Sequence, residues 1–256
     1  MHTSINNGPL VSVIMPSYNA ECFIAESIES VLCQTYPHWE LLITDDCSID
    51  HTPAIVQQYC QKDARIDFVV AKSHSGIANT RNQSIARAKG RYVAFLDNDD
   101  LWVPEKLEKQ VEFMMQNDFA FSYSEYEILR EDGTPKGKII KTAGVIDYGK
   151  YLRNTIIGSG TIMLDRDKVG SLKMPDNATS DDMALWCKIL KDGHHAYPIK
   201  EVLMRYRIRS NSASANKWKA AKDVWLVYRK QEKLPFFNAM MCFVGYAFNA
   251  VIKRVF

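Results

Sequence analysis

Three carboxylates, Asp97, Asp99 and Asp100, come directly after Tyr92 to Leu96, an apolar run without Gly or Pro. Such a run is typical of a strand that is buried on both faces. Carboxylates crowded at the end of a buried strand repel one another, and burial favours their neutral form, so a positive partner is expected beside them. A divalent cation is the usual partner, because Mg²⁺ is commonly held by one or two carboxylates together with substrate phosphates. The alternative is a solvated acidic turn that caps the following helix.

Other predicted strand ends carry side chains that could bind a nucleotide. They are Pro16 and Tyr18 after residues 11–15, Asp45 and Asp46 after residues 41–44, and Arg81 near the start of a helix predicted over 77–88. An aromatic ring can stack on a base, and carboxylates can accept a base N–H or hold ribose hydroxyls. An arginine near a helix N-terminus can bind phosphate. With a metal on the carboxylates, this set describes a site for a nucleoside diphosphate.

The elements that must position these side chains alternate between strand and helix. Strands are predicted over 11–15, 41–44, 67–71 and 92–96, and helices over 21–34, 50–61 and 77–88. This alternation predicts a parallel sheet with right-handed crossovers, in which ligands bind outside the carboxyl ends of the strands. The first strand is followed by no G-x-G-x-x-G, and the chain has no G-x-x-x-x-G-K-[ST], which argues against a dinucleotide fold and a P-loop NTPase.

The second half predicts a helix over 104–117, a strand over 119–129 with a hairpin turn at 131–133, and a loop feeding a strand over 154–165. Asp181 and Asp182 immediately precede a helical run at 184–191, and His194 and His195 are expected in a loop. Acids at a helix start are also what capping looks like. Residue type alone favours capping for Asp181 and leaves Asp182 open between capping and chemistry.

The bulk composition fits a globular protein. The chain has 256 residues, with 46% apolar residues and 24% charged residues. None of its six cysteines forms a C-x-x-C pair, so a zinc site is not expected, and the polar N-terminus does not resemble a secretory signal. We therefore expect a cytoplasmic protein with free thiols.

Five stretches in order resemble glycosyltransferase family 2. They are Val11 to Asn19, Thr44 to Asp50, Gly76 to Asn82, Gly90 to Trp102 and Asp181 to Trp186. The resemblance covers about residues 10–210 and implies a GT-A fold, an α/β architecture with a Rossmann-like nucleotide-binding sheet. It divides the chain into a nucleotide-sugar half over about 10–103, an acceptor half over 104–210, and C-terminal helices over 211–256.

The resemblance also implies an inverting transfer from a nucleotide sugar, most often a UDP-sugar, with Mg²⁺ or Mn²⁺ as cofactor. The family's Asp-x-Asp falls on Asp97 and Asp99, with Asp99 as the metal ligand. Its base-reading carboxylate falls on Asp46, and its diphosphate arginine on Arg81. Its catalytic base falls on Asp182, so the resemblance favours a catalytic role for that residue over helix capping.

Two positions depart from the family pattern. Asp181 stands where the family has Glu, and Tyr206-Arg207-Ile208-Arg209 stands where it has Tyr-Arg-x-His. Arg207 or Arg209 can still meet the leaving diphosphate, but arginine cannot titrate near neutrality. The looser likeness is to bacterial transferases of teichuronic acid, lipopolysaccharide and capsule synthesis. Two rival functions remain, a nucleotidyltransferase with a similar sheet and a sugar-nucleotide-binding scaffold with a dead base.

The C-terminal segment is basic and apolar. From Lys200 onward the chain has 12 Lys and Arg against 3 Asp and Glu, a net charge of +9, which leaves −7 for the rest. The helical spacing of Trp218, Trp225 and Tyr228, with Lys and Arg between them, predicts an interfacial helix over 217–233. The apolar run Leu234 to Ile252 ends at Lys253 and Arg254 and is short for a membrane span. We therefore expect it to lie in or against the cytoplasmic leaflet, with the basic residues on anionic lipid headgroups.

These features predict a protein that lies on the inner face of the cell membrane. We expect a saccharide acceptor that is linked to a lipid, and no nucleic-acid partner. The alternative is an ordinary pair of C-terminal helices packed on the catalytic domain.

Overall fold

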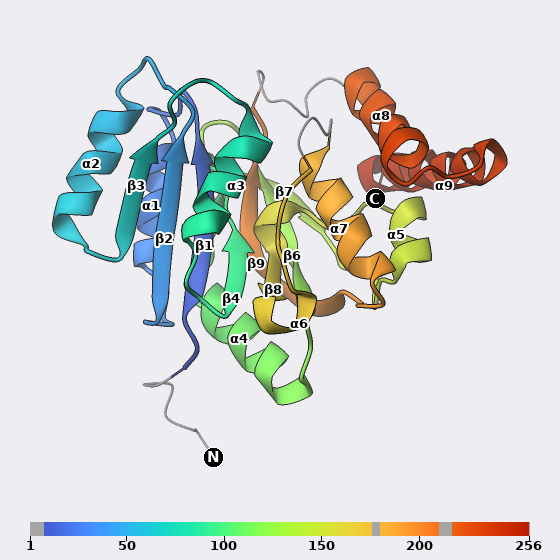
Figure 1. Ribbon diagram of the computed structural model, residues 1–256, viewed down its shortest axis with the longest axis horizontal. Coiled ribbons are helices and arrows are strands. Elements are labelled where there is room, and N and C mark those ends of the chain that lie inside the picture. The colour runs from blue at the N-terminus through green and yellow to red at the C-terminus, as the bar shows by residue number, and fades with distance from the viewer. Residues whose placement is uncertain (1–7, 176–179, 210–216, 256) are drawn as a thin grey trace.

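The computed structural model describes residues 8–175, 180–209 and 217–255 (Figure 1). Its strands are β1 (Val11–Ser17), β2 (Trp39–Asp45), β3 (Ile66–Val70), β4 (Tyr92–Phe95), β5 (Leu101–Trp102), β6 (Phe121–Leu129), β7 (Pro135–Ile140), β8 (Ile162–Asp165) and β9 (Tyr197–Arg207). Its helices are α1 (Ile24–Leu32), α2 (Thr52–Lys62), α3 (Ile77–Arg87), α4 (Lys106–Asn117), α5 (Tyr148–Arg153), α6 (Arg166–Val169), α7 (Asp181–Lys191), α8 (Lys217–Leu226) and α9 (Phe236–Val255), with the short turns η2 (Ser159–Thr161) and η3 (Val227–Gln231).

The described strands form one sheet in the order β3-β2-β1-β4-β8-β6-β9-β5, with β7 paired to β6. The strands β3, β2, β1 and β4 are parallel, which confirms the βα alternation predicted for the first half. The second half joins the same sheet through the antiparallel pair of β4 with β8. No break in the sheet therefore separates residues 10–103 from residues 104–210.

Helices cover both faces of the sheet, because the strands at its centre are apolar on both sides (Figure 1). On one face Phe95 and Phe121 pack around the buried ring of Trp186 from α7, with ring centroids 5.7 and 5.6 Å from it. On the other face Ile28 of α1 and Leu107 of α4 belong to a second fully buried cluster. These two layers hold the strand ends in fixed positions.

Several predicted boundaries differ from the structure. β1 continues through Pro16 to Ser17, where a turn was expected. β4 ends at Phe95 opposite Ile14, so the missing N–H of Pro16 has no ladder bond to make on that side. The helix expected over 21–34 is shorter, and the strand β9 and the helix α5 were not predicted.

The C-terminal helices pack on α5 and α7, away from β1 to β3 (Figure 1). The expectation that the aromatic face of residues 217–233 meets a membrane is wrong for two of its three rings. Tyr228 is fully buried, and Trp225 packs edge-on against Phe236 and Phe243 of α9. Only Trp218 of the three is exposed. Within the described residues, no helix combines the length and the apolar character that crossing a bilayer requires.

Candidate active site at the carboxyl edge of the sheet

The acids after β4 meet arginines from two distant segments. Asp97 Oδ1 accepts a hydrogen bond from Nη2 of Arg81 at 2.5 Å, and Asp99 Oδ2 accepts one from Nη1 of Arg209 at 3.0 Å. Arg81 comes from α3, and Arg209 lies just beyond β9. The positive partners expected beside these carboxylates are therefore present in the protein itself, and a metal is not needed to balance the two charges.

Arg81 is a positive charge between Asp97, which follows β4, and the acids Asp181 and Asp182 of α7. Its side chain is buried, and although burial disfavours its charge, the carboxylates of Asp97, Asp182 and Asp181 raise its pKa above the ordinary value. Its Nε has no described hydrogen-bond partner. The guanidinium thus keeps an unused donor at the point where the acids after β4 approach the start of α7.

Asp100 is a structural residue in this arrangement. It is buried, and its Oδ1 accepts the backbone N–H of Arg207 at 2.9 Å. Burial, together with the neighbouring charges of Asp99 and Asp97, raises its pKa well above the usual range. Asp100 therefore joins the end of β9 to the loop after β4, and it is not free to serve as a third metal ligand.

The carboxylates do not form a complete metal site by themselves. No group of three or more Asp, Glu, His or Cys residues within the described ranges is arranged to hold a metal ion. Burial and the neighbouring charge of Asp97 raise the pKa of Asp99, although Arg209 opposes this shift. Each of these two carboxylates has one oxygen bonded to an arginine, and oxygen ligands suit Mg²⁺ when substrate phosphates complete the set. The residues therefore fit a metal that arrives with a diphosphate.

Arg207 is fully engaged inside the protein. Its Nε donates to the carbonyl of Asp99, its Nη1 to the carbonyl of Glu131, and its Nη2 to Oε2 of Glu26 at 2.5 Å. These contacts hold the loop after β4 against α1 and the β6–β7 turn. The contact that we expected between Arg207 and the nucleotide sugar remains a prediction, and Arg209 is the better placed of the two.

The ends of β1 and β2 form a second part of the edge. Asp46 Oδ1 accepts the backbone N–H of Ser75, its Oδ2 accepts that of Gly76, and His74 Nδ1 lies 3.1 Å from Oδ2. The half-exposed rings of Tyr18 and His74 lie against each other with centroids 4.6 Å apart. Asp46 therefore fixes the loop before α3, and Tyr18 and His74 form an exposed aromatic surface beside it.

The strand end at Pro16 is tied to the acidic loop. Asn98 Nδ2 donates to the carbonyl of Pro16 at 3.1 Å. Asp45 joins the end of β1 to the loop after β2, since it accepts hydrogen bonds from the hydroxyls of Ser17 and Ser48. These bonds keep the loops after β1, β2 and β4 in one surface.

Asp181 and Asp182 form the first turn of α7. Asp182 Oδ1 accepts the backbone N–H of Met183. Burial raises the pKa of Asp182, and the pKa of Asp181 rises to about 6 mainly through burial. Arg81 opposes both shifts. A carboxylate with a raised pKa is a stronger base than a free aspartate.

The structure thus brings together residues that are far apart in the sequence. Asp97 pairs with Arg81, the charges of Asp182 and Arg81 act on each other, and Asp99 pairs with Arg209. Sequence reasoning missed His74 and Glu26. His74 stands three residues after the strand expected over 67–71, but no pattern joins it to Tyr18. Glu26 reaches Arg207 from 181 residues away, and no local signal reveals such a pair.

Comparison with known proteins supplies the family. The model of the family described as glycosyl transferase family 2 matches residues 12–169. A Bacillus subtilis glycosyltransferase, TuaG, named for teichuronic acid biosynthesis, is 51% identical over 247 residues, which span 96% of this chain and 98% of that protein. The Escherichia coli enzyme WfgD, named UDP-Glc:alpha-D-GlcNAc-diphosphoundecaprenol beta-1,3-glucosyltransferase, is 41% identical over 84% of each chain.

Solved structures agree with the expected GT-A fold. S. aureus TarS 1-349 in complex with UDP-GlcNAc gives a TM-score of 0.70 at 19% identity, over 86% of this chain and 64% of that chain. The mannosyltransferase PcManGT from Pyrobaculum calidifontis, in complex with GDP-Man and Mn²⁺, gives 0.70 at 20% identity, over 90% and 66%. From its family match and from relatives that extend along most of its length, this chain belongs to glycosyl transferase family 2 and is a glycosyltransferase.

Proposed function

We propose that this enzyme transfers a sugar, with inversion, from a UDP-sugar to a saccharide acceptor carried on a lipid diphosphate, in surface polysaccharide synthesis. The observation that carries the proposal is the meeting of Asp182, Arg81 and Asp97 at the carboxyl edge of the sheet. The printed names of TuaG and WfgD support the pathway, the donor and the acceptor class.

The chemistry needs one base and no covalent intermediate. Asp182 accepts the proton of an acceptor hydroxyl while that oxygen attacks the anomeric carbon of the donor. The attack comes from the face opposite the diphosphate, so the bond from the anomeric carbon to the diphosphate oxygen breaks as the new glycosidic bond forms. The bonding electrons leave with the nucleoside diphosphate, and the configuration at the anomeric carbon inverts. General-base help of this kind contributes roughly 10²- to 10⁴-fold.

The leaving diphosphate gains negative charge during this step, and arginines are placed to stabilise it. Arg81 and Arg209 each hold a carboxylate through an Nη atom, and each keeps a buried Nε without a described partner. We assign both to the diphosphate. A Mg²⁺ or Mn²⁺ ion on Asp99, with Asp97 beside it, would supply Lewis-acid stabilisation of the diphosphate oxygens.

The nucleoside is assigned to the other part of the edge. Tyr18, with His74 against it, offers an exposed ring for stacking on a base. Asp46 is the carboxylate assigned to the base. Its two oxygens already accept the backbone N–H groups of Ser75 and Gly76, so we propose that it also holds this loop in shape. Pro16 would line the floor between base and diphosphate.

The domain division follows the same roles. We propose that residues 10–103 form the nucleotide-sugar half, that 104–210 form the acceptor half, and that 211–256 attach the enzyme to the inner face of the cell membrane. The attachment is proposed because a lipid-linked acceptor must be met at the bilayer. The residues at the start of the last segment, 210–216, and the side chains of Lys253 and Arg254 lie outside the described part of the chain.

The substitution Asp182→Asn tests the proposal, because it removes the base with almost no change in shape. Transfer to a saccharide acceptor should fall by about 10² or more, while the affinity for UDP-sugar stays the same. The neighbouring Asp181→Asn is the matched control and should retain most of the transfer. A loss under tenfold for Asp182→Asn would return that residue to a capping role.

The same assay separates the rival functions. A nucleotidyltransferase would make a new phosphorus–oxygen bond and would not need Asp182. A scaffold with a dead base would bind the UDP-sugar and show no turnover in the unmodified protein. Product analysis by mass spectrometry distinguishes a transferred sugar from a transferred nucleotide.

A further inference from the structure

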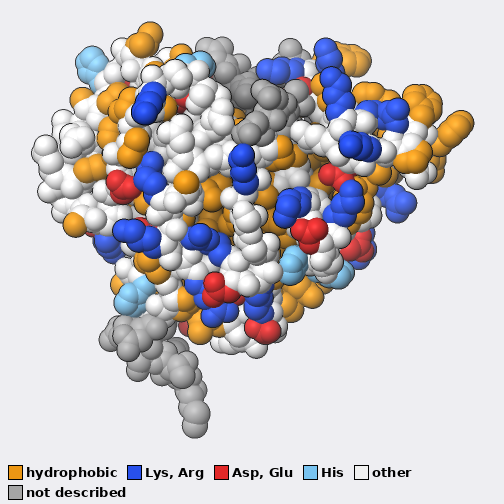
Figure 2. Space-filling view, in the orientation of Figure 1, with side chains coloured by type: hydrophobic (Ala, Val, Ile, Leu, Met, Phe, Trp, Pro, Cys, Tyr) orange, Lys and Arg blue, Asp and Glu red, His pale blue; other side chains and the backbone are white. Residues whose placement is uncertain are grey.

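The outward face of α9 is apolar from Phe236 to Phe248. Phe237, Met241, Val244 and Phe248 recur at helical spacing, and they are 79%, 69%, 59% and 66% exposed. Phe236 and Met240 extend the same face. Figure 2 shows hydrophobic side chains gathered at this end of the molecule, with Lys and Arg beside them. A surface helix of a globular protein normally turns polar residues to water, so this face requires a partner.

The orientation of α9 is fixed by close contacts on its other side. Ala239 and Cys242 are buried, and a Cβ added at Gly245 would lie 3.0 Å from Cβ of Arg153 on α5. Asn249 Nδ2 donates to the carbonyl of Arg153 at 3.1 Å. Because the inner face is held so closely, the helix cannot turn its apolar outer face inward.

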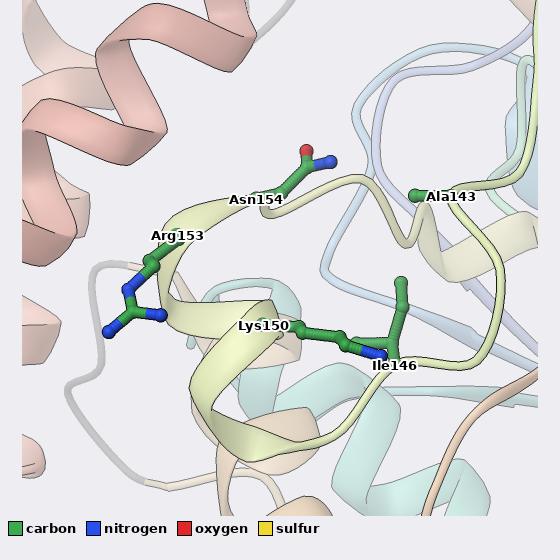
Figure 3. Close-up of a pocket in the computed structure, with 5 residues that line it drawn as sticks. All are labelled: Ala143, Ile146, Lys150, Arg153 and Asn154. Carbon is green, nitrogen blue, oxygen red and sulfur yellow. The ribbon is translucent and has the colours of Figure 1, made fainter.

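One cation, Arg153, lies against α9, and a second, Lys150, follows on the same helix α5 and donates to the carbonyl of Val145. Arg153 and Lys150 line a pocket of about 230 Å³ with Asn154, Ala143 and Ile146, and no acid lines it (Figure 3). Figure 3 shows Lys150 extending toward Ile146 and Arg153 extending away from it. Neither side chain pairs with a carboxylate in the part of the chain that the structure describes. On the side of α8, exposed basic residues follow at Lys222, Arg229 and Lys230.

We propose that the outward face of α9 inserts into the acyl layer of an anionic bilayer, with α9 parallel to the surface and Arg153 at the phosphate headgroups. The stripe from Phe237 to Phe248 covers ~17 Å along the helix axis, enough for an in-plane helix. Uncharged residues from Leu234 to Ile252 let the face enter hydrocarbon without burying a charge.

Charge favours the bilayer over a second copy of this chain. A symmetric pair joined through α9 would bring the cations of both copies together, whereas anionic lipid neutralises them. The inference rests on the proposed function in one respect, since a lipid-linked acceptor gives the enzyme a reason to lie there. It keeps residues 234–252 at the membrane, as expected, and removes the aromatic face of residues 217–233 from that contact, because Tyr228 and Trp225 are packed inward.

Flotation with vesicles of phosphatidylglycerol and phosphatidylethanolamine tests the proposal on the full chain. The double variant Phe237→Glu, Met241→Glu should bind at least about tenfold more weakly than the unmodified protein. Met115→Glu is the matched control, because Met115 is an exposed methionine on α4, and it should float like the unmodified protein. Arg153→Gln should weaken binding to anionic vesicles and leave the residual binding to phosphatidylcholine unchanged.

Each outcome decides the question. Equal flotation of the double variant and the unmodified protein would overturn the proposal, as would a failure of the unmodified protein to float. A loss of dimer on sedimentation of the double variant, without a change in flotation, would assign the face to a second copy instead. Flotation needs no turnover, so a protein that floats and transfers no sugar would refute the proposed function and leave this inference intact.

Discussion

The carboxyl edge of the sheet and the outward face of α9 differ in how their charges are balanced. At the edge, buried acids are paired with arginines from distant segments, as in Arg81 with Asp97 and Arg209 with Asp99. On α9 the exposed side chains from Phe236 to Phe248 carry no charge, and the neighbouring cation Arg153 has no carboxylate partner among the described residues. A region whose charges are balanced internally is built to hold a polar substrate in a fixed place. A region with exposed apolar and unpaired basic side chains is built to meet a surface.

The largest expected effect is on turnover at the edge. Asp99→Asn removes the proposed metal carboxylate, and transfer should fall by about 10²-fold, because metal-based charge stabilisation contributes several kcal/mol. Chelation by EDTA should have a similar effect on the unmodified enzyme, and Mn²⁺ should restore its activity. Full activity after chelation would show that Arg81 and Arg209 stabilise the diphosphate without a metal. The charges at the sheet edge would then be balanced by protein side chains alone.

Stability should respond strongly at the edge as well. Arg81→Gln leaves Asp97 and the acids of α7 without their buried cation, and the free energy of unfolding should fall by about 3 kcal/mol in urea titrations. Lys188→Gln breaks an ion pair with Asp192 in which both side chains are 55% exposed, and should cost less than about 0.5 kcal/mol. Similar losses for the two variants would mean that the edge does not depend on its buried pairs.

A smaller effect should depend on pH. Because the folded pKa of Asp181 is raised to about 6 from 3.8, the folded state holds a proton that the unfolded state has released between these values. Stability from this group is therefore lost as the pH rises from about 4 to about 6. Asp181→Asn should be more stable than the unmodified protein by about 1–3 kcal/mol at pH 8, and the two should converge near pH 4. Urea titrations at both pH values measure this, and a constant difference would contradict the shift.

The smallest expected effect is on the outward face of α9. Met241→Glu replaces a residue that is 69% exposed, so the free energy of unfolding should change by less than about 0.5 kcal/mol. Its neighbour Cys242 is only 8% exposed, and Cys242→Glu should cost several kcal/mol through burial of an unpaired charge. Thermal unfolding of the two variants measures the contrast, and a large loss for Met241→Glu would mean that this face is covered in the folded protein.

The sequence predicted the parallel half of the fold because its signals are local. Apolar runs such as Tyr92 to Leu96 identify buried strands, and the carboxylates that follow them identify the edge that they share. Asp182 could be separated from a helix cap only through resemblance to a family, because both roles use an acid in the first turn.

The parts that could not be predicted depend on contacts between distant segments. Nothing local joins Glu26 to Arg207 or His74 to Tyr18. The sequence therefore could not show that Arg207 is hydrogen-bonded to Glu26, whereas Arg209 pairs with Asp99. The prediction of which C-terminal face meets lipid was wrong for a different reason. When both faces of a segment are apolar, as from Phe236 to Ala250, periodicity does not say which face turns inward.

One sheet runs through both proposed substrate halves, and this has a consequence for how the enzyme reaches its transition state. β4 and β8 pair directly, and β5 returns from the first half to pair with β9 at the far edge. The halves therefore cannot close on one another about a hinge, as two separate domains would. The distance between the anomeric carbon and the attacking hydroxyl must be set in advance by a rigid frame, so that binding itself supplies most of the entropy cost of bringing the reactants together.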